Sequence, residues 1–217
     1  MFTLHRSKGY LRFYRSIQLF ANPFLRLVYR VKIIKGKNLC LGMNGGLILC
    51  SNHLSSLDPI MMCAYFPRPI YFMSKIELFR NKFLKSFFGF FNSFPVNRKG
   101  FGRNPIITAV EVLKSGNVFG IFPEGTRSGS GELGEIRKGV GLIAYLSHVP
   151  IMPMAIYNSK KVPREKYKKS LFPKIKIIFG DLIETEEIIS NYPKREAIEK
   201  ISDIVTDNIR TLYSGFD

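Results

Sequence analysis

A histidine and an aspartate five positions apart are the residues of this chain best suited to catalysis. His53 and Asp58 lie at the two ends of the segment 53–58, directly after a short apolar run. A neutral imidazole can accept the proton of an attacking hydroxyl, and a carboxylate on its other nitrogen fixes the tautomer. The spacing therefore predicts a general base that activates an alcohol. A histidine considered alone is more often a hydrogen-bonded structural residue, so this alternative stays open.

The residues around this pair also carry structural signals. Asp58 precedes Pro59, and an aspartate cap followed by proline in the first turn is typical of a helix start. One oxygen of Asp58 could cap that helix while the other accepts a hydrogen bond from the imidazole. Ser55 and Ser56 do not lie in the G-x-S-x-G sequence that exposes a nucleophilic serine, so we expect no covalent intermediate.

Two further segments place basic side chains after short apolar runs. Residues 122–128 contain a glycine turn followed by a threonine, an arginine and a serine, and these side chains suit a phosphate group. Residues 94–100 place an arginine and a lysine in a similar position. Each segment considered alone is also typical of an ordinary surface turn.

Short β-type runs alternate with helical stretches along the rest of the chain. Strands are expected at residues 31–35, 47–50, 70–73, 118–122, 151–157 and 175–179, and helices near 59–66, 78–90, 104–115 and 139–147, with a closing helix around 198–212. This alternation predicts an α/β domain with a largely parallel sheet flanked by helices. Ligands of such sheets bind beyond the carboxyl ends of the strands, so the segments after residues 50 and 122 should face one cleft.

The first 30 residues form an amphipathic pattern. On a helix, their basic residues lie opposite a side that is rich in aromatic and aliphatic residues. Asn22 and Pro23 favour the end of one helix and the start of another, so we expect a helical hairpin. A basic, aromatic helix suits an anionic membrane surface, and the alternative is an ordinary helix docked on the core. We therefore divide the chain into a membrane-anchoring amphipathic segment, residues 1–30, and one α/β domain, residues 31–217.

The charge of the chain limits its partners. It has 33 Lys and Arg against 16 Asp and Glu, a net charge of +17 that attracts nucleic acid, an anionic bilayer or an acidic protein. No nucleic-acid-binding motif is visible, so we expect no nucleic acid partner. Cys40, Cys50 and Cys63 lack metal-ligand spacing and favour reduced thiols in a cytoplasmic compartment. We expect neither a membrane-spanning helix nor a cleaved secretory signal.

Five segments, taken in order, resemble the motifs of the glycerolipid acyltransferase family, which includes the 1-acylglycerol-3-phosphate acyltransferases. They are Asn52-His53-x4-Asp58, Lys75–Leu78, Pro95–Arg98, Phe122–Ser128 and Val149–Pro153. The resemblance implies that His53 is the general base and Asp58 its orienting partner. It also implies which residues bind the glycerol phosphate of the acceptor: Glu124, Gly125, Thr126 and Arg127, helped by Arg98 and Lys75. Many members have Asp-Arg where this chain has Asn97 and Arg98.

The resemblance further implies the reaction. A fatty acyl group would pass from an acyl thioester to the sn-2 hydroxyl of 1-acylglycerol 3-phosphate, forming phosphatidic acid in phospholipid biosynthesis. The co-substrate would be an acyl carrier protein or coenzyme A thioester, with no metal or other cofactor. The enzyme would lie on the cytoplasmic face of the membrane as a peripheral or monotopic protein. Backbone amides near His53 are candidates for stabilising the oxyanion.

Some alternatives stay open at the level of sequence. An acyltransferase of the same family could act on a lyso-ornithine lipid or on glycerol 3-phosphate. From another class, the chain could be a non-catalytic basic module that binds membranes, although such a module would not need a base with an orienting carboxylate. The basic residues between Lys160 and Lys176 could bind an acidic acyl carrier protein or anionic lipid, or form a solvated loop.

Overall fold

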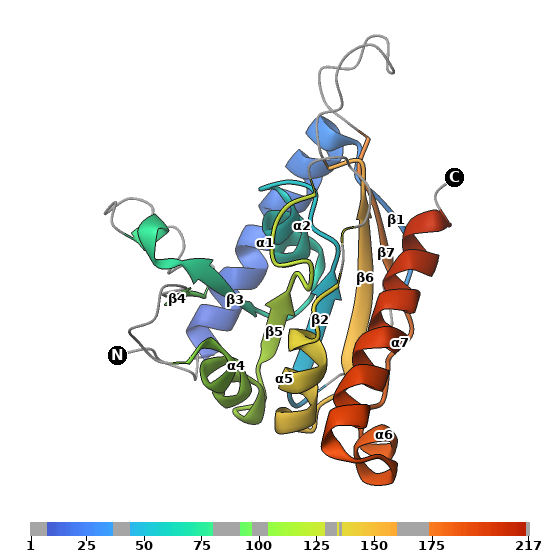
Figure 1. The fold of residues 1–217 in the computed structure, drawn as a ribbon. Coiled ribbons are helices and arrows are strands. Elements are labelled where there is room, and N and C mark those ends of the chain that lie inside the picture. The colour runs from blue at the N-terminus through green and yellow to red at the C-terminus, as the bar shows by residue number, and fades with distance from the viewer. Residues whose placement is uncertain are drawn as a thin grey trace.

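The chain folds around one sheet that is covered by helices on both faces, as a computed structural model shows (Figure 1). The structure describes residues 8–36, 44–79, 92–96, 104–128, 134, 136–159 and 174–215. Within these ranges the seven strands are β1 (Lys32–Lys35), β2 (Leu47–Ser51), β3 (Ile70–Lys75), β4 (Ser93–Val96), β5 (Val118–Ile121), β6 (Ile151–Tyr157) and β7 (Lys176–Phe179). Their order is β1-β7-β6-β2-β5-β3-β4, and every neighbouring pair is parallel except β6 and β7. The predicted α/β fold with a largely parallel sheet is confirmed.

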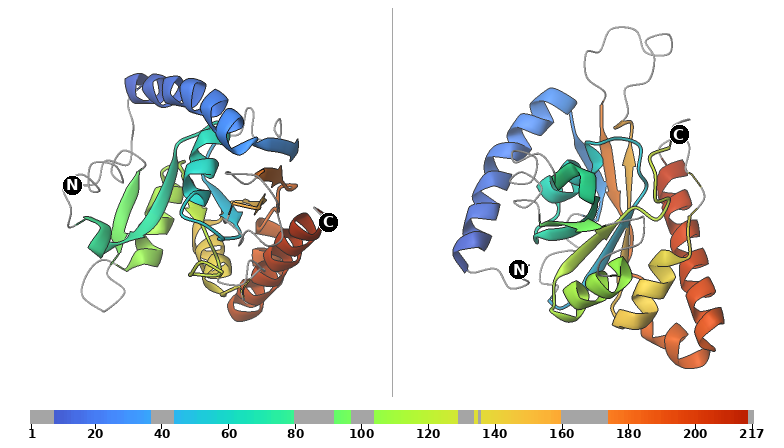
Figure 2. Two further views of the ribbon diagram at one scale, coloured as in Figure 1. Left: turned by 90° about the horizontal axis from the view of Figure 1, so that it is seen from above. Right: turned by 60° about the vertical axis from the view of Figure 1, so that its left-hand side comes forward.

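The helices form one layer on each face of the sheet. They are α1 (Lys8–Tyr29), α2 (Asp58–Tyr65), α4 (Pro105–Lys114), α5 (Gly139–Ser147), α6 (Glu186–Asn191) and α7 (Lys194–Ser214). One face carries α1 and α2, and the other carries α4, α5 and α7 (Figures 1 and 2). In β2, Leu47 and Leu49 pack toward α2, whereas Ile48 and Cys50 pack toward the other layer. A strand covered on both faces must be apolar throughout, which explains the continuous apolar run.

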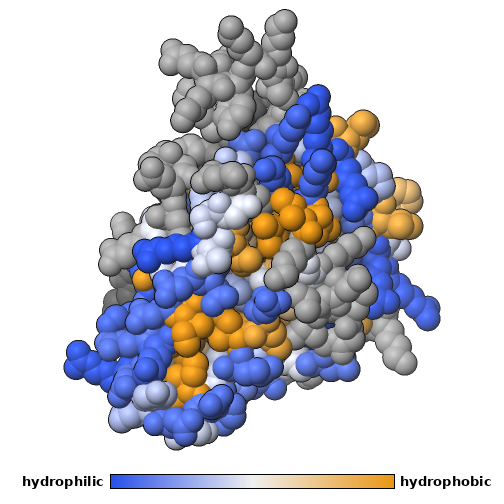
Figure 3. Space-filling view, turned by 90° about the vertical axis from the view of Figure 1, so that its right-hand side faces the viewer, coloured by the Kyte–Doolittle hydropathy of each residue, from blue (hydrophilic) through white to orange (hydrophobic). Residues whose placement is uncertain are grey.

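The closing helix α7 packs its apolar side against the rest of the domain. Ile201, Val205 and Ile209 are fully buried at helical spacing, as the sequence predicted. On the face of the molecule that includes α7, apolar side chains form separate patches among hydrophilic ones (Figure 3). The helix therefore contributes to the core.

Two elements were not predicted, β4 and α6. β4 contains Pro95, which cannot donate a ladder hydrogen bond, and within the described sheet this strand pairs only with β3. Proline is tolerated on such an edge strand, although it weakens the strand pattern in the sequence. α6 has six residues, too few to show a helical period. Of the helix expected near 78–90, the structure describes only the first two positions, which belong to the 3-10 helix η1 (Ile76–Phe79). Residues 80–90 lie outside the described residues.

The N-terminal helix α1 is continuous, so the predicted hairpin is wrong. The helix passes through Pro23 without ending. Pro23 cannot donate to the carbonyl of Leu19, but both residues are exposed, and water can replace the missing donor. Residues on both sides of the proline, Tyr14 and Leu25, are buried and hold the two halves in line.

Polar side chains of α1 hold it against the end of α2. Tyr14 Oη donates to the carbonyl of Cys63 at 2.8 Å. Gln18 Nε2 donates to the carbonyls of Cys63 and Phe66 at 2.7 and 2.6 Å. Because the last carbonyls of a helix have no partner within it, α1 supplies donors that α2 lacks. Among the described helices, none has both the length and the apolar character needed to cross a membrane.

Candidate functional site

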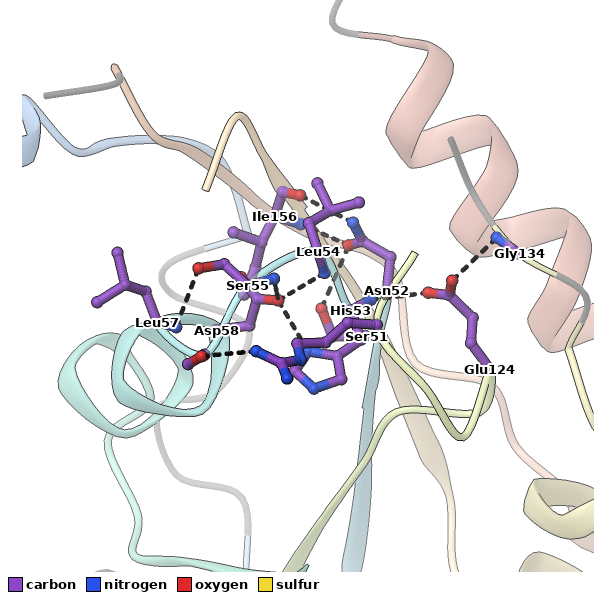
Figure 4. Close-up of polar contacts among 12 residues, drawn as sticks. Ser51, Asn52, His53, Leu54, Ser55, Leu57, Asp58, Glu124, Gly134 and Ile156 are labelled. Carbon is purple, nitrogen blue, oxygen red and sulfur yellow. Dashed lines mark hydrogen bonds and ion pairs between the residues drawn. The ribbon is translucent and has the colours of Figure 1, made fainter. Parts of the chain in front are cut away.

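The two main polar segments of the sequence meet at one edge of the sheet. β2 and β5 are parallel neighbours, with Cys50 opposite Ile121. The carboxyl ends of both strands therefore lie side by side, and the segments that follow them, 52–58 and 122–128, are in contact. The predicted juxtaposition is confirmed, and Figure 4 shows the polar contacts that result.

His53 and Asp58 form the predicted pair. Nδ1 of His53 lies 2.9 Å from Oδ2 of Asp58. The Asp58 side chain is completely buried, whereas the His53 side chain is 18% exposed. A carboxylate accepts hydrogen bonds, so the contact favours the tautomer with its proton on Nδ1. Nε2 is then an acceptor, and it has no hydrogen-bond partner among the described residues.

Asp58 closes the turn in a different way from the one predicted. α2 begins at Asp58 itself, after Leu57, and the carboxylate does not cap the helix. Instead Oδ2 also accepts from the backbone N–H groups of Leu54 and Ser55, both at 2.7 Å. The prediction of a capping oxygen is therefore wrong. One oxygen receives three donors, which fixes the chain between the histidine and the helix.

An aromatic ring holds the imidazole from one side. Phe122 stacks on His53 with ring centroids 4.1 Å apart and an interplanar angle of 19°. Phe122 is itself stacked on Phe72 of β3, with centroids at 6.2 Å. The plane of the imidazole is therefore set by Phe122, which directly follows β5, and the Phe122 ring is in turn held by Phe72 of β3.

Glu124 contacts the main chain on both of its oxygens. Oε1 accepts from the backbone N–H of His53 at 2.7 Å, and Oε2 accepts from that of Gly134 at 2.9 Å. Glu124 is only 5% exposed. Burial raises the pKa of the Cys50 thiol, and the nearby charge of Glu124 raises it further. The Glu124 carboxylate therefore influences a group in the protein interior. Both carboxylate oxygens thus contact main-chain donors, and the expected contact of Glu124 with an acceptor phosphate stays a prediction.

The rest of the 122–128 loop is also tied to the first motif. Gly125 N–H donates to the Phe122 carbonyl at 3.0 Å, and Ser128 N–H donates to the His53 carbonyl at 2.9 Å. Gly125 has a φ of +72°, a conformation that favours glycine, and its position lies close to the side chain of Arg137. Thr126 and Arg127 are exposed, and Arg127 Nη1 donates to Ser56 Oγ at 2.9 Å.

Asn52 has a role that sequence reasoning missed. Its Oδ1 accepts from the Ile156 N–H at 2.8 Å, and its Nδ2 donates to the Ile156 carbonyl at 2.9 Å. The side chain is buried and joins the end of β2 to β6. A polar residue directly after a buried strand was the available signal. Its carboxamide carries both donor and acceptor atoms, which match the carbonyl and the N–H of one main-chain residue.

The remaining predicted site residues are placed only in part. Lys75 is the last residue of β3, which pairs with β5, so its main chain lies at the same sheet edge. Arg98 and Asn97 lie outside the described residues, as do Cys40 and residues 160–173 of the basic segment. In the part of the chain that the structure describes, no three His, Cys, Asp or Glu side chains are grouped closely enough to hold a metal ion.

Comparisons with known proteins agree on one family. A family model described as Acyltransferase matches residues 20–157, more than half of the chain. The 1-acyl-sn-glycerol-3-phosphate acyltransferase of Bacillus subtilis is 30% identical over 188 residues, which cover 86% of this chain and 90% of that protein. A probable 1-acyl-sn-glycerol-3-phosphate acyltransferase of Mycoplasma genitalium is 31% identical over 150 residues, covering 63% of this chain and 56% of that protein.

A solved structure shares the fold. The crystal structure of the 1-acyl-sn-glycerophosphate acyltransferase PlsC from Thermotoga maritima aligns with a TM-score of 0.71 at 20% sequence identity. The alignment covers 96% of this chain and 83% of that chain. At this identity the likeness supports the arrangement of strands and helices.

We predict that Asn52→Ala destabilises the protein, because it leaves the buried N–H and carbonyl of Ile156 without partners. The free energy of unfolding, measured by urea denaturation, should fall by about 2–4 kcal/mol. Asn208→Ala is the matched control, since its Nδ2 donates to the Ile204 carbonyl on an exposed part of α7. The control should change the free energy of unfolding by less than about 0.5 kcal/mol. Equal losses in both variants would contradict the bridging role of Asn52.

Proposed function

Because the chain belongs to the glycerolipid acyltransferase family, we propose that it is a 1-acylglycerol-3-phosphate O-acyltransferase. It transfers a fatty acyl group from an acyl thioester to the sn-2 hydroxyl of 1-acylglycerol 3-phosphate and forms phosphatidic acid. The observation that carries the proposal is the buried Asp58 carboxylate bonded to His53, which leaves Nε2 available as a proton acceptor. The reaction is inferred from the relatives named above, and the His53–Asp58 pair provides the general base that this reaction requires.

The proposed reaction requires one base and no covalent intermediate on the protein. Nε2 of His53 accepts the proton of the sn-2 hydroxyl while the oxygen bonds to the thioester carbonyl carbon, giving a tetrahedral oxyanion. Collapse of the oxyanion breaks the carbon–sulfur bond and releases a thiolate. A thiol has a reference pKa of about 8.5, so its thiolate leaves with little help and can take the proton from the imidazolium. Asp58 stabilises the imidazolium throughout.

Most backbone amides of the first motif are not available to the oxyanion. The N–H of His53 donates to Glu124, and those of Leu54 and Ser55 donate to the Asp58 carboxylate. The N–H groups of Leu57 and Asp58 both donate to Ser55, to its hydroxyl and its carbonyl in that order. Within residues 53–58, only the Ser56 amide has no acceptor among the described residues. An oxyanion donor from this segment would therefore be Ser56, because the other amides are needed to fix the turn.

Arg127 is the residue proposed to bind the acceptor phosphate. It is exposed, and Ser56 Oγ occupies one of its five N–H donors, so the others can contact phosphate oxygens. A phosphate held there would keep the sn-2 hydroxyl close to the imidazole. Thr126 is exposed beside Arg127, and we propose that it contributes with Gly125, Arg98 and Lys75. Either an acyl carrier protein or a coenzyme A thioester would serve as donor.

The exposed side of α1 supports association with a membrane. Phe20 and Leu27 are 78% and 81% exposed, and Phe13 and Phe24 lie on the same side of the helix. This row is separate from the side that docks on α2, so packing within the protein does not require it. Exposed arginines lie on the same helix, at Arg12, Arg15 and Arg26, and directly after it, at Arg30. We propose a peripheral position in which the aromatic row enters the acyl boundary and the arginines contact anionic headgroups, on the cytoplasmic face.

His53→Ala should abolish most of the activity, because it removes the group that accepts the hydroxyl proton. We expect kcat to fall by about two to four orders of magnitude, and Asp58→Asn to act in the same direction. The measurement is thiol release from an acyl thioester that depends on added lysophosphatidate. His148→Ala is the control, since His148 has the same 2.9 Å contact with a carboxylate, Glu186, at an exposed site. Near-normal turnover by His53→Ala would rule out the base role.

Arg127→Ala should weaken acceptor binding. We expect KM for lysophosphatidate to rise about ten- to a hundredfold, because charge-assisted hydrogen bonds to the phosphate are lost, with little change in KM for the thioester. Steady-state kinetics with each substrate varied in turn measure both constants. Arg195→Ala, a change at the start of α7, should leave them unaltered. An unchanged KM for lysophosphatidate would show that Arg127 does not bind the phosphate.

Replacing Phe20 and Phe24 by serine should reduce membrane binding without unfolding the protein, because both side chains are exposed. We expect weaker co-sedimentation with phosphatidylglycerol vesicles, and nearly unchanged activity on lysophosphatidate dispersed below its micellar concentration. The control is Ile107→Ser, which removes an exposed apolar side chain from α4 on the other side of the sheet. If the double variant bound vesicles as well as the parent protein does, the aromatic row would not be the membrane-binding surface.

A further inference from the structure

Glu124 is a buried acidic side chain for which the proposed mechanism has no chemical step. It follows β5, and at 5% exposure it is almost completely withdrawn from solvent. A buried carboxylate is unfavourable unless hydrogen bonds compensate it. The hydrogen bonds of the Glu124 carboxylate therefore indicate its role in the protein.

Both of its oxygens bind main-chain N–H groups. One donor belongs to His53 at 2.7 Å and the other to Gly134 at 2.9 Å. His53 lies beyond Ser51, the last residue of β2, so its N–H is outside the strand ladder. Glu124 supplies the acceptor that the ladder no longer provides. Hydrogen bonds to an ionised acceptor are stronger than neutral ones, so the contact can fix this peptide group.

The contact is one of three that fix His53 from the same loop. Ser128 N–H donates to the His53 carbonyl, and the Phe122 ring stacks on the imidazole. Asp58 fixes the ring from the other side through Nδ1. Together these contacts define the main chain and the ring plane of His53, and thereby the direction of Nε2.

Charge also argues against an acceptor-binding role for Glu124. An acceptor phosphate is an anion, and a carboxylate beside it would repel it. Arg127, three residues later, is exposed and carries the complementary charge. The loop therefore combines a buried residue that faces the base with an exposed residue that can face the acceptor.

We infer that Glu124 is a positioning residue for the general base, fixing the main chain of His53, and not a ligand of the acceptor phosphate. This inference rests on the proposed acyltransferase function. A positioning residue acts on the rate of proton transfer, so its loss should lower kcat. A phosphate ligand acts on acceptor binding, so its loss should raise KM for the acceptor.

The test is Glu124→Gln, which keeps size and shape but turns one acceptor oxygen into an NH2 group facing a backbone donor. We expect kcat to fall about ten- to a hundredfold, because small misplacements of a base have effects of this size. KM for lysophosphatidate should stay within about twofold. A raised KM with unchanged kcat, or no change in either constant, would overturn the inference.

A second variant perturbs the same contact without altering the carboxylate. A Cβ on Gly134 would lie 2.7 Å from Oε2 of Glu124, so Gly134→Ala should displace the side chain. We expect the same fall in kcat at constant KM, with a native circular dichroism spectrum as the check on folding. Glu199→Gln is the control, since Glu199 is an exposed acid on α7 that pairs with Lys138, and it should alter neither constant.

The parent protein in the same assay separates the proposed function from the positioning role of Glu124. If it releases thiol only when lysophosphatidate is present, the proposed function stands, and the variants judge Glu124 alone. If the parent protein shows no such activity with either donor thioester, the proposed function fails and this inference fails with it.

Discussion

The parallel pairing of β2 with β5 is the constraint on which the rest of the site depends. Each strand is central in the sheet, and its apolar residues are buried on both faces. Because the two strands run in the same direction and in register, the chain leaves both at the same level. The segment with His53 and the segment with Arg127 then lie within hydrogen-bond distance although about 70 residues separate them. The burial that stabilises the sheet therefore also assembles the site.

Polar groups at this sheet edge are buried, and each is compensated mainly by main-chain atoms. Asn52 pairs with both groups of Ile156, Asp58 accepts two amides and the imidazole, and Glu124 accepts two amides. Main-chain donors move less than side chains, so a network of this kind is rigid. One atom, Oδ1 of Asp58, is buried with no partner among the described residues. All hydrogen bonds that described residues make to the Asp58 carboxylate are thus accepted by the oxygen that faces His53. This arrangement orients the imidazole, but it leaves the other buried oxygen of the carboxylate without a hydrogen bond from any described residue.

The sequence predicts those parts of this arrangement that depend on local pattern. Buried strands appear as apolar runs, and the polar residues that follow them mark the sheet edge, which is why the segments of His53 and Arg127 were found. Long-range pairings leave no such pattern: nothing in the sequence connects Glu124 with the amide of His53, or Asn52 with Ile156. The Pro23 signal was misleading for the opposite reason. Local propensity predicts a break, whereas tertiary contacts of Tyr14 and Leu25 keep the helix continuous.

Helix α2 connects the proposed membrane surface with the proposed base. Asp58 is its first residue, and the carbonyls near its end accept hydrogen bonds from Tyr14 and Gln18 of α1. An eight-residue helix is about 12 Å long, which is short enough to transmit position without bending. If the exposed row of α1 lies in the acyl boundary, the height of Asp58, and of the imidazole bonded to it, is then fixed relative to the bilayer. The sn-2 hydroxyl of a lysolipid lies near the headgroup level, so a base held at constant depth meets it without extraction of the acyl chain.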